Sequence, residues 1–367
     1  MLVAAHVLAV LAGAAIALLT LFSALGTFVV PRGVAARLTR IVFRVVRRLF
    51  DVRLHFARTE ASREDVMAWY APLSLFALVG VWILLLMGAF SLVFRGLGVA
   101  SWRQAVESSG SSLTTLGFVP VDGLGRQLAA FADAALGLLL LALLITYLPT
   151  MYASFQRREA LVTRAAMQAG NPPTGVELLQ RFQGIAGFEA LEGQVWQPWT
   201  QGFVDIEESH TSMAALAFFR SPRPERHWLT AGGAVLDAAT LRASTVEGPR
   251  QASAELCIRA GFLALRHIAD FYGIPYDEDP SRGDPISVTR DEWEDARARL
   301  GASGVALRAD LDEAWLDFAG WRVNYDAVLL ALANLVMAPV APWTSDRGPT
   351  HRHRPPVLGR RRRRGGA

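Results

Sequence analysis

Three long apolar runs occupy most of the first 156 residues, and beyond them apolar and polar positions mix as in a water-soluble protein. Asp, Glu, Lys and Arg are absent from all three runs, which cover residues 1–31, 66–94 and 134–156. Each run exceeds the roughly 20 apolar residues that an α-helix needs to cross a bilayer. The pattern predicts three transmembrane helices, at about 3–30, 70–94 and 128–153.

The distribution of arginine predicts how these helices are oriented. The segment 32–66 holds nine arginines against four acidic residues, and an arginine excess in a short loop marks the cytoplasmic side. The loop at 95–126 would then lie outside, and everything after residue 156 inside. Residues 1–31 are expected to be a retained anchor, because they lack the positive start of a cleaved secretory signal and are about twice as long as its apolar part.

The segment 32–66 is also expected to form a basic amphipathic linker. Its apolar positions recur at helical spacing, at Leu38, Ile41, Val45 and Leu49, and arginines occupy the other sides. A helix of this kind lies in the membrane surface, where anionic headgroups attract its basic side chains. The expected lipid-binding residues are Arg44, Arg47 and Arg48.

After residue 156 the composition indicates a cytoplasmic helical domain, residues 157–344. Leu256, Leu263 and Ile268 share one predicted helix face, and Thr289 with Glu292 forms the capping box that opens a helix. No convincing strand pattern occurs. The lone Cys257 excludes an intramolecular disulfide. The arginine-rich tail, residues 345–367, is poor in apolar residues and is expected to be disordered.

The loop between the second and third predicted spans contains the most informative sequence, SSLTTLGFVP, at residues 111–120. Backbone can enter a membrane between two spans only where it is buried in protein or lines a water-filled cavity. One known solution is a half-crossing helix followed by an extended segment whose carbonyl oxygens replace the hydration shell of an ion. The order Thr114, Thr115, Leu116, Gly117, Phe118 suits such a segment, since glycine permits backbone angles that other residues resist.

This stretch resembles the filter of the pore-loop potassium channels, which reads Thr-x-Gly-Tyr/Phe-Gly. Thr115 to Phe118 match four of the five positions, and the resemblance covers residues 70–155. It implies a pore domain at 67–156, with an outer helix, a pore helix at about 102–113, a re-entrant loop and an inner helix. The implied filter residues are Thr114, Thr115, Leu116, Gly117, Phe118 and Val119.

The same resemblance implies an all-α membrane protein of the bacterial plasma membrane that conducts potassium or another monovalent cation passively. A carbonyl ring needs four contributors, so a chain with one pore loop implies a homotetramer. The residues after residue 156 resemble uncharacterised C-terminal regions of channel-like bacterial membrane proteins, which implies no activity for them.

The chain departs from the filter pattern at Val119 and Pro120, where the family has a second glycine and usually aspartate. A β-branched residue at positive φ costs on the order of 1–2 kcal/mol, and proline drives its predecessor toward extended angles. A second function therefore stays open: a non-conducting, channel-like scaffold or sensor whose cytoplasmic domain is the functional part. A membrane-tethered helical enzyme is a third, weaker reading.

Four further residues are candidates for gating or for the cation pathway. Gly137 lies near the position of a family hinge, and Pro149 removes a helical hydrogen bond near the inner exit, although packing is the alternative role for both. Asp133 is the one formally charged residue within a predicted span, which favours function, although it could also reach the outer interface. Asp122 lies at the outer mouth.

Other chemistry has little sequence support. Glu207 and His210 have the i, i+3 spacing of a di-iron ligand pair, but no second pair accompanies them. The acidic loop at 277–284 lacks the glycine and closing glutamate of a calcium loop. No catalytic or nucleotide-binding motif is present, so we expect no enzyme activity, metal or cofactor. The terminal arginines lack interleaved aromatic residues, so lipid is a better partner than nucleic acid.

Overall fold

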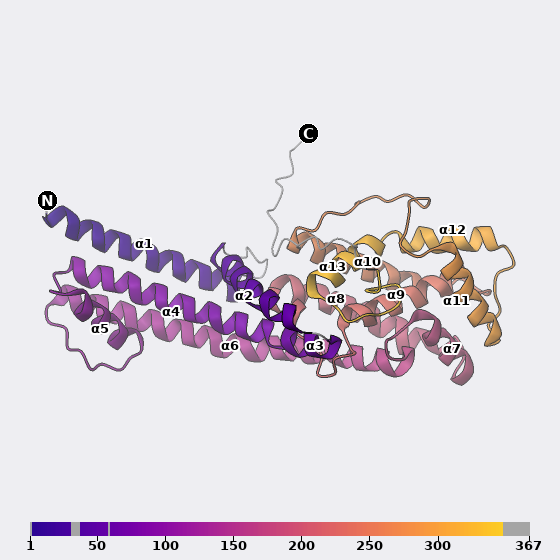
Figure 1. Ribbon diagram of the computed structural model, residues 1–367, viewed down its shortest axis with the longest axis horizontal. Helices are drawn as coiled ribbons and strands as arrows, with labels where there is room; N and C mark the ends of the chain where they lie inside the picture. The colour runs from indigo at the N-terminus through magenta and orange to yellow at the C-terminus, as the bar shows by residue number, and fades with distance from the viewer. Residues whose placement is uncertain (1, 31–36, 58, 348–367) are drawn as a thin grey trace. The chain divides into compact units, whose positions relative to one another are not determined.

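The regular elements of the described chain are helical (Figure 1). The computed structural model describes residues 2–30, 37–57 and 59–347, and within these ranges the one β feature is an antiparallel bridge between Val246 and Leu307. The predicted all-α class is thus confirmed. Residues 1 and 31 of the predicted anchor, 32–36 and 58 of the predicted linker, and 348–367 of the predicted tail lie outside the described residues.

The helices of the first part of the chain are α1 (Leu2–Phe28), α2 (Arg37–Phe56), α3 (Glu60–Ala68), α4 (Tyr70–Gly96), α5 (Trp102–Leu113) and α6 (Leu124–Ala169). Those that follow are α7 (Gly175–Ile185), the π-helix η1 (Glu192–Trp196), α8 (Gln197–Ser212), the 3₁₀-helix η2 (Ala214–Phe218), α9 (Trp228–Ser244), α10 (Ala252–Tyr272), α11 (Arg290–Ala302), α12 (Leu311–Arg322) and α13 (Asp326–Val336).

Three helical stretches are long and apolar enough to cross a membrane, namely Val3–Phe28, Ser62–Gly96 and Leu124–Ala169. They contain the second and third predicted spans in full and the first as far as Phe28, two residues before its predicted end, so all three are confirmed as apolar helices of spanning length. The third helix continues well beyond the predicted end at residue 153, because no glycine follows in it before Gly170.

The chain divides into two compact units. Unit 1 contains the residues up to Val52 together with Trp69–Tyr152, and unit 2 contains Arg53–Ala68 and the residues from Ala153 onward. The division within α6 lies four residues before the predicted domain boundary. Helix α3 belongs to unit 2 although it directly precedes α4 in sequence, so the predicted linker is shared between the units.

Unit 1 is built on close packing of α1 against α4. A Cβ atom at Gly13 would lie 2.4 Å from the carbonyl oxygen of Ala89, and one at Gly96 would lie 2.6 Å from that of His6. Small residues let transmembrane backbones approach in this way. The indole nitrogen of Trp82 also donates to the Ser23 hydroxyl, 3.2 Å away, which fixes the register of the two helices.

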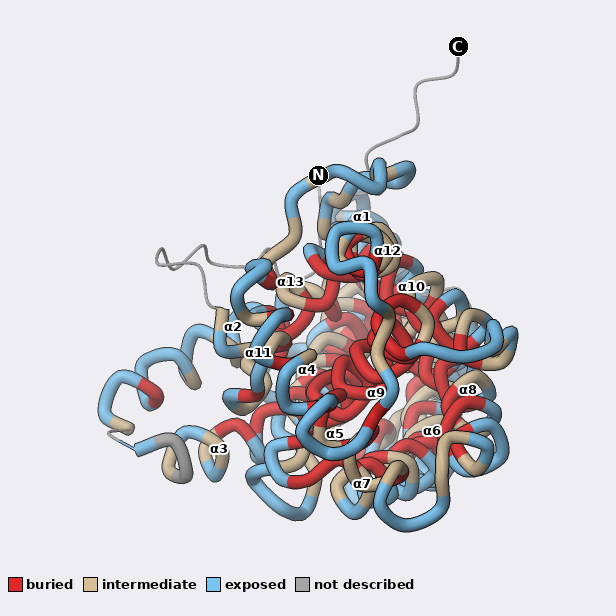
Figure 2. Tube along the Cα trace, turned by 90° about the vertical axis from the view of Figure 1, so that its right-hand side faces the viewer, coloured by how far each residue is buried: buried red, intermediate tan, exposed pale blue. Residues whose placement is uncertain are grey.

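Unit 2 is organised around α9, which is buried along nearly its whole length and contacts α7, α10, α12 and α13 (Figure 2). Most of its residues are apolar, as burial on all sides requires, and the polar side chains that it buries have partners within the unit, as Asp237 has in Arg322. The predicted capping box of Thr289 and Glu292 is confirmed at the start of α11.

The predicted face of α10 needs correction. Leu256 is exposed, whereas the buried face of α10 includes its small neighbour Cys257 together with Gly261. A Cβ atom at Gly261 would lie 2.4 Å from Leu236 of α9, so small residues set this face because the two helices pack closely there.

Candidate functional site

Helix α5 packs against α4 and meets α6 through two pairs of residues. The Ser109 hydroxyl donates to Oδ2 of Asp133 at 2.7 Å. The Leu113 carbonyl oxygen lies against Gly137, where a Cβ atom would be only 2.1 Å away. Gly137 is thirteen residues after Leu124, the first residue of α6, which corresponds to about 20 Å along the helix axis.

The chain folds back on α5 immediately after Leu113, through residues 114–119, which we call loop 114–119. Its amides turn toward Ser111: the N–H groups of Leu116 and Gly117 donate to the Ser111 carbonyl at 3.0 and 3.2 Å. The Val119 N–H donates to the Ser111 hydroxyl at 3.1 Å. Ser111 thus organises the loop, a role that sequence reasoning missed although the serine-rich sequence hinted at it.

Two residues of loop 114–119 have left-handed backbone conformations. Thr115 has φ 58° and Gly117 has φ 68°. Glycine accepts such angles readily, whereas a threonine there costs on the order of 1–2 kcal/mol. Val119 is not among the described non-glycine residues with positive φ. The backbone strain that the sequence suggested for Val119 therefore lies at Thr115.

The carbonyl oxygens of loop 114–119 have no partner among the described residues, whereas every amide of the loop except that of Phe118 donates a hydrogen bond. The carbonyl oxygens of Thr115, Leu116, Gly117 and Phe118 accept no hydrogen bond from any described residue. The side chains of Leu116 and Phe118 are 70% and 62% exposed. Carbonyl groups need partners wherever water is scarce, so this loop presents a set of acceptors to a ligand, water or another chain.

The remaining residues predicted for gating or for the cation pathway lie at different positions in α6 or just before it. Asp133 is fully buried beside Ser109, and its Oδ1 has no partner among the described residues. Gly137 lies at the contact with α5. Pro149 is exposed twelve residues further along α6, and Asp122 is exposed in the turn that precedes the helix. The structure therefore brings Asp133 and Gly137 to loop 114–119 through α5, and leaves Pro149 and Asp122 apart.

Helix α6 has a buried and an exposed face within unit 1. The buried face carries Asp133, Leu140, Tyr147 and Met151. The opposite side exposes Ala135, Ala142, Thr146 and Pro149, together with large apolar residues such as Phe131, Leu138 and Ile145.

Helix α2 presents three different faces. Val42 and Phe43 are buried. An exposed apolar stripe follows, formed by Ile41, Val45, Leu49, Val52 and Phe56, each at least half exposed. Of the predicted lipid-binding residues, Arg44 and Arg48 are exposed. Arg47 instead bonds to Asp51 at 3.0 Å and lies over the ring of Tyr70, with its side chain 11% exposed.

Unit 2 contains a buried cluster of arginine and histidine on both sides of η2. Arg158 of α6 donates to the carbonyl oxygens of Leu216 and Phe219, each at 2.8 Å, and lies 3.2 Å from Nε2 of His210. Burial, reinforced by the positive charge of Arg158, lowers the pKa of His210 well below its usual value. Burial likewise lowers the pKa of His227, with Arg220 and Arg158 adding to the effect.

Arg220 connects distant parts of unit 2. Its guanidinium donates to the carbonyl oxygens of Val336 and Met337, each at 2.8 Å, at the end of α13. It also pairs with Glu64 of α3 at 3.3 Å. A buried charge is tolerated only when it is paired and hydrogen-bonded, so these contacts fix α3 to the segment after η2.

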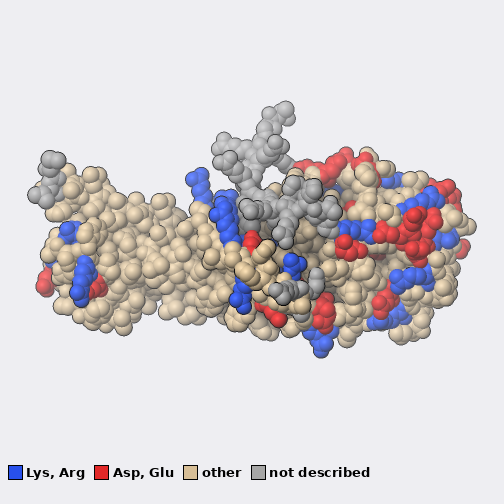
Figure 3. Space-filling view, viewed as in Figure 1, with Lys and Arg blue, Asp and Glu red and all other residues tan. Residues whose placement is uncertain are grey.

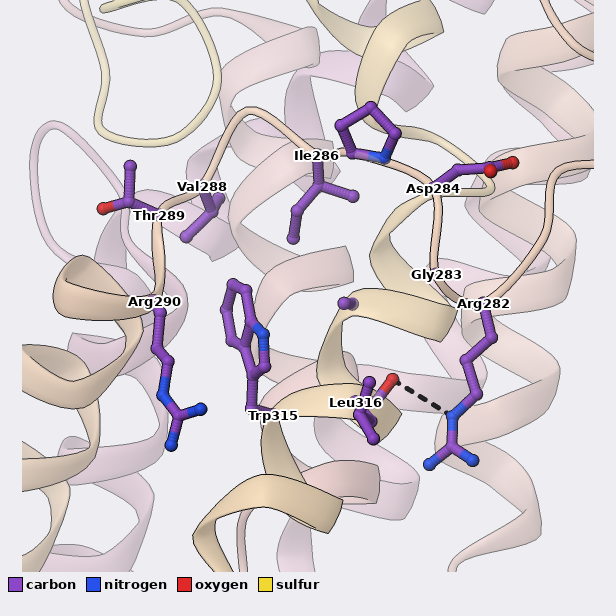
Figure 4. Close-up of a pocket in the computed structure, with 11 residues that line it drawn as sticks. Arg282, Gly283, Asp284, Ile286, Val288, Thr289, Arg290, Trp315 and Leu316 are labelled. Carbon is purple, nitrogen blue, oxygen red and sulfur yellow. Dashed lines mark hydrogen bonds between the residues drawn. The ribbon is translucent and has the colours of Figure 1, made fainter.

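A shallow pocket of unit 2 lies between residues 282–290 and α12 (Figure 4). The Trp315 indole faces into it, with Arg282 and Arg290 on either side. Arg282 pairs with Glu313 and Asp317, and Arg290 pairs with Glu294 and Asp312, at distances of 2.7 to 2.9 Å. Because both arginines are already neutralised by carboxylates, the pocket has no evident preference for a charged ligand.

Glu207 and His210, which have the sequence spacing of a metal-ligand pair, do not come together in unit 2. Glu207 pairs with His267 at 2.6 Å, whereas His210 is buried against Arg158. Among the described residues, no three His, Cys, Asp or Glu side chains gather as a metal site.

Comparisons of the whole chain with models of protein families, with curated proteins and with solved structures find no match.

Proposed function

We propose that this chain is one subunit of a tetrameric cation channel, with potassium as the expected ion and loop 114–119 as its filter. The observation that carries the proposal is the set of carbonyl oxygens from Thr115 to Phe118, which lack a partner within the described chain. Four copies around an axis would direct these oxygens at a dehydrated ion, as carbonyl rings do in ion filters. The resemblance of Thr115 to Phe118 to a potassium filter supports the same assignment.

The depth of α5 supports a re-entrant loop. Spans α4 and α6 flank α5, and the end of α5 lies beside Gly137, about 20 Å along α6 from its start. If α6 crosses a bilayer whose apolar core is about 30 Å thick, loop 114–119 lies well inside it. Backbone at that depth requires burial in protein or contact with a water-filled path.

The exposed face of α6 provides the inner wall of the proposed pore. Ala142, Thr146 and Pro149 lie opposite the face that packs within unit 1, so they are free to face a central axis. Proline weakens the helix at that point and makes Pro149 the preferred position for a gate.

The charge distribution of unit 1 supports its membrane placement. In the face shown in Figure 3, charged side chains of unit 1 gather near α2 and at the end that carries α5, with an uncharged band between. In this placement unit 2 is cytoplasmic, and α2 lies on the inner leaflet with its exposed apolar stripe in lipid. Arg44 and Arg48 then meet anionic headgroups, while Arg47 stays bound to Asp51.

The test is potassium flux into liposomes that contain the purified full-length chain. The parent should pass potassium, and Gly117→Ala should abolish most of the flux, because Gly117 has φ 68° within the filter. Gly123→Ala is the matched control: this glycine has φ 91°, and at both positions a Cβ atom meets open space. Equal flux from both variants and the parent would contradict the filter assignment.

The departure at Val119 and Pro120 favours one alternative, a non-conducting scaffold or sensor that works through unit 2. The double change Val119→Gly with Pro120→Asp separates the two functions. A silent parent that gains potassium flux through this change supports the scaffold. A parent that conducts already supports the channel.

A further inference from the structure

We propose that Asp133 and Gly137 are positioning residues that hold loop 114–119 in its working geometry through a two-point lock on α5. The inference deepens the proposed function and rests on it for the role of the loop. The lock consists of the Ser109–Asp133 hydrogen bond and the close approach of Leu113 to Gly137.

The spacing of the two contacts defines a register between the helices. Ser109 and Leu113 are four residues apart on α5, and Asp133 and Gly137 are four residues apart on α6, so each pair lies on one face of its helix. Gly137 has no side chain, so the two helices can approach closely there, and Asp133 supplies a hydrogen-bond acceptor one turn away. A shift of α5 by one turn would break both contacts together.

The burial of the Asp133 side chain is unfavourable in free energy. The side chain is fully buried, Oδ2 accepts from Ser109, and Oδ1 has no partner among the described residues. A buried polar atom without a partner is unfavourable, and an apolar residue could fill the same space at lower cost. The main contribution of the carboxyl group is therefore to position α5 through a directed hydrogen bond, and its contribution to stability is smaller.

Ser111 connects the two-point lock on α5 to loop 114–119. Ser111 is two residues beyond Ser109 on α5, and it accepts the N–H groups of Leu116 and Gly117 at its carbonyl and that of Val119 at its hydroxyl. A tilt of α5 at Ser109 therefore moves three amides of the loop and the carbonyl oxygens between them.

The test compares Ser109→Ala and Asp133→Leu, each of which removes the hydrogen bond, with Asp133→Asn, which keeps an acceptor oxygen for Ser109. Ser112→Ala is the matched control, because among the described residues the Ser112 hydroxyl bonds only to the Ser108 carbonyl oxygen of its own helix. In liposomes the ratio of potassium to sodium flux should fall in the first two variants, by up to about tenfold, the limit reached when the whole free energy of one hydrogen bond is lost from the filter geometry. Asp133→Asn should recover most of the ratio, and Ser112→Ala should match the parent.

A second measurement keeps the lock testable if the parent does not conduct. Leu116→Cys places a thiol on the exposed loop, and its labelling rate by a membrane-impermeant reagent reports loop geometry. The native Cys257 is buried and burial raises its pKa to about 12, so it stays unlabelled. Labelling rates that change with Ser109→Ala and Asp133→Leu, but not with Ser112→Ala, support the lock. Rates and flux ratios that equal those of the parent in both lock variants overturn it, whatever the conduction result.

Discussion

The carbonyl oxygen of Leu113 occupies the space that a side chain at residue 137 would need, 2.1 Å from the position of a Cβ atom on Gly137. This contact assigns Gly137 a packing task at the end of α5. A glycine that admits a neighbouring backbone is a close-approach residue, whether or not it also bends the helix.

Gly137→Ala should therefore displace α5 and destabilise the solubilised protein by about 1–3 kcal/mol, the usual cost of overpacking. Chemical unfolding of the full chain in detergent measures the change. Gly88→Ala serves as the control, because a Cβ atom at Gly88 of α4 meets no atom within 4 Å. A Gly137→Ala variant as stable as Gly88→Ala would show that α5 does not pack as described.

Cysteine substitution should map the exposed face of α6. Ala142→Cys and Thr146→Cys should react with a water-soluble thiol reagent applied from the cytoplasmic side, and the reaction should reduce ion flux, because these residues are proposed to line the pore. Leu140→Cys should stay unmodified, since Leu140 is buried within the chain. Modification of Leu140→Cys alone would mean that the opposite face of α6 lines the path.

Acid should destabilise unit 2 through its buried histidines. His210 and His227 have pKa values lowered well below the usual 6.5 by burial and nearby arginines, so each takes up a proton when the chain unfolds below that pH. Stability then falls as pH falls, by about 1.4 kcal/mol per pH unit for each histidine between pH 6.5 and its folded pKa.

His227→Asn tests this dependence on its own. The Nδ1 atom of His227 accepts from the Leu229 N–H at the start of α9, and asparagine can make the same cap. Denaturant unfolding of the full chain at pH 6.5, 6.0 and 5.5 should show about half the parent's slope of stability against pH, because one histidine remains. An unchanged slope would mean that His227 is already protonated in the folded chain.

Local features of this chain could be predicted well from its sequence. The pore helix expected at 102–113 coincides with α5, and the outer helix expected at 70–94 ends two residues short of Gly96. Apolar runs, N-capping serine and threonine residues, and glycines at helix ends are signals carried within a few residues of the structure that they determine.

Contacts between distant residues could not be predicted in this way. Ser109 and Asp133 are 24 residues apart, and Glu64 and Arg220 are 156 residues apart, so no periodicity links them. The buried face of α10 was also misjudged, because Leu256 outweighs Cys257 in hydrophobicity while close packing selects the smaller residue. Such choices depend on the neighbouring helix, which the local pattern does not contain.

The residues from Leu216 to Arg220 contact two stretches of unit 2 that are far apart in sequence, one in α6 and one in α3. Arg158, on the part of α6 that belongs to unit 2, donates to the carbonyl oxygens of Leu216 and Phe219, and Glu64 of α3 pairs with Arg220. A displacement of these five residues would act at the same time on α3, which directly precedes α4 in sequence, and on the part of α6 that belongs to unit 2.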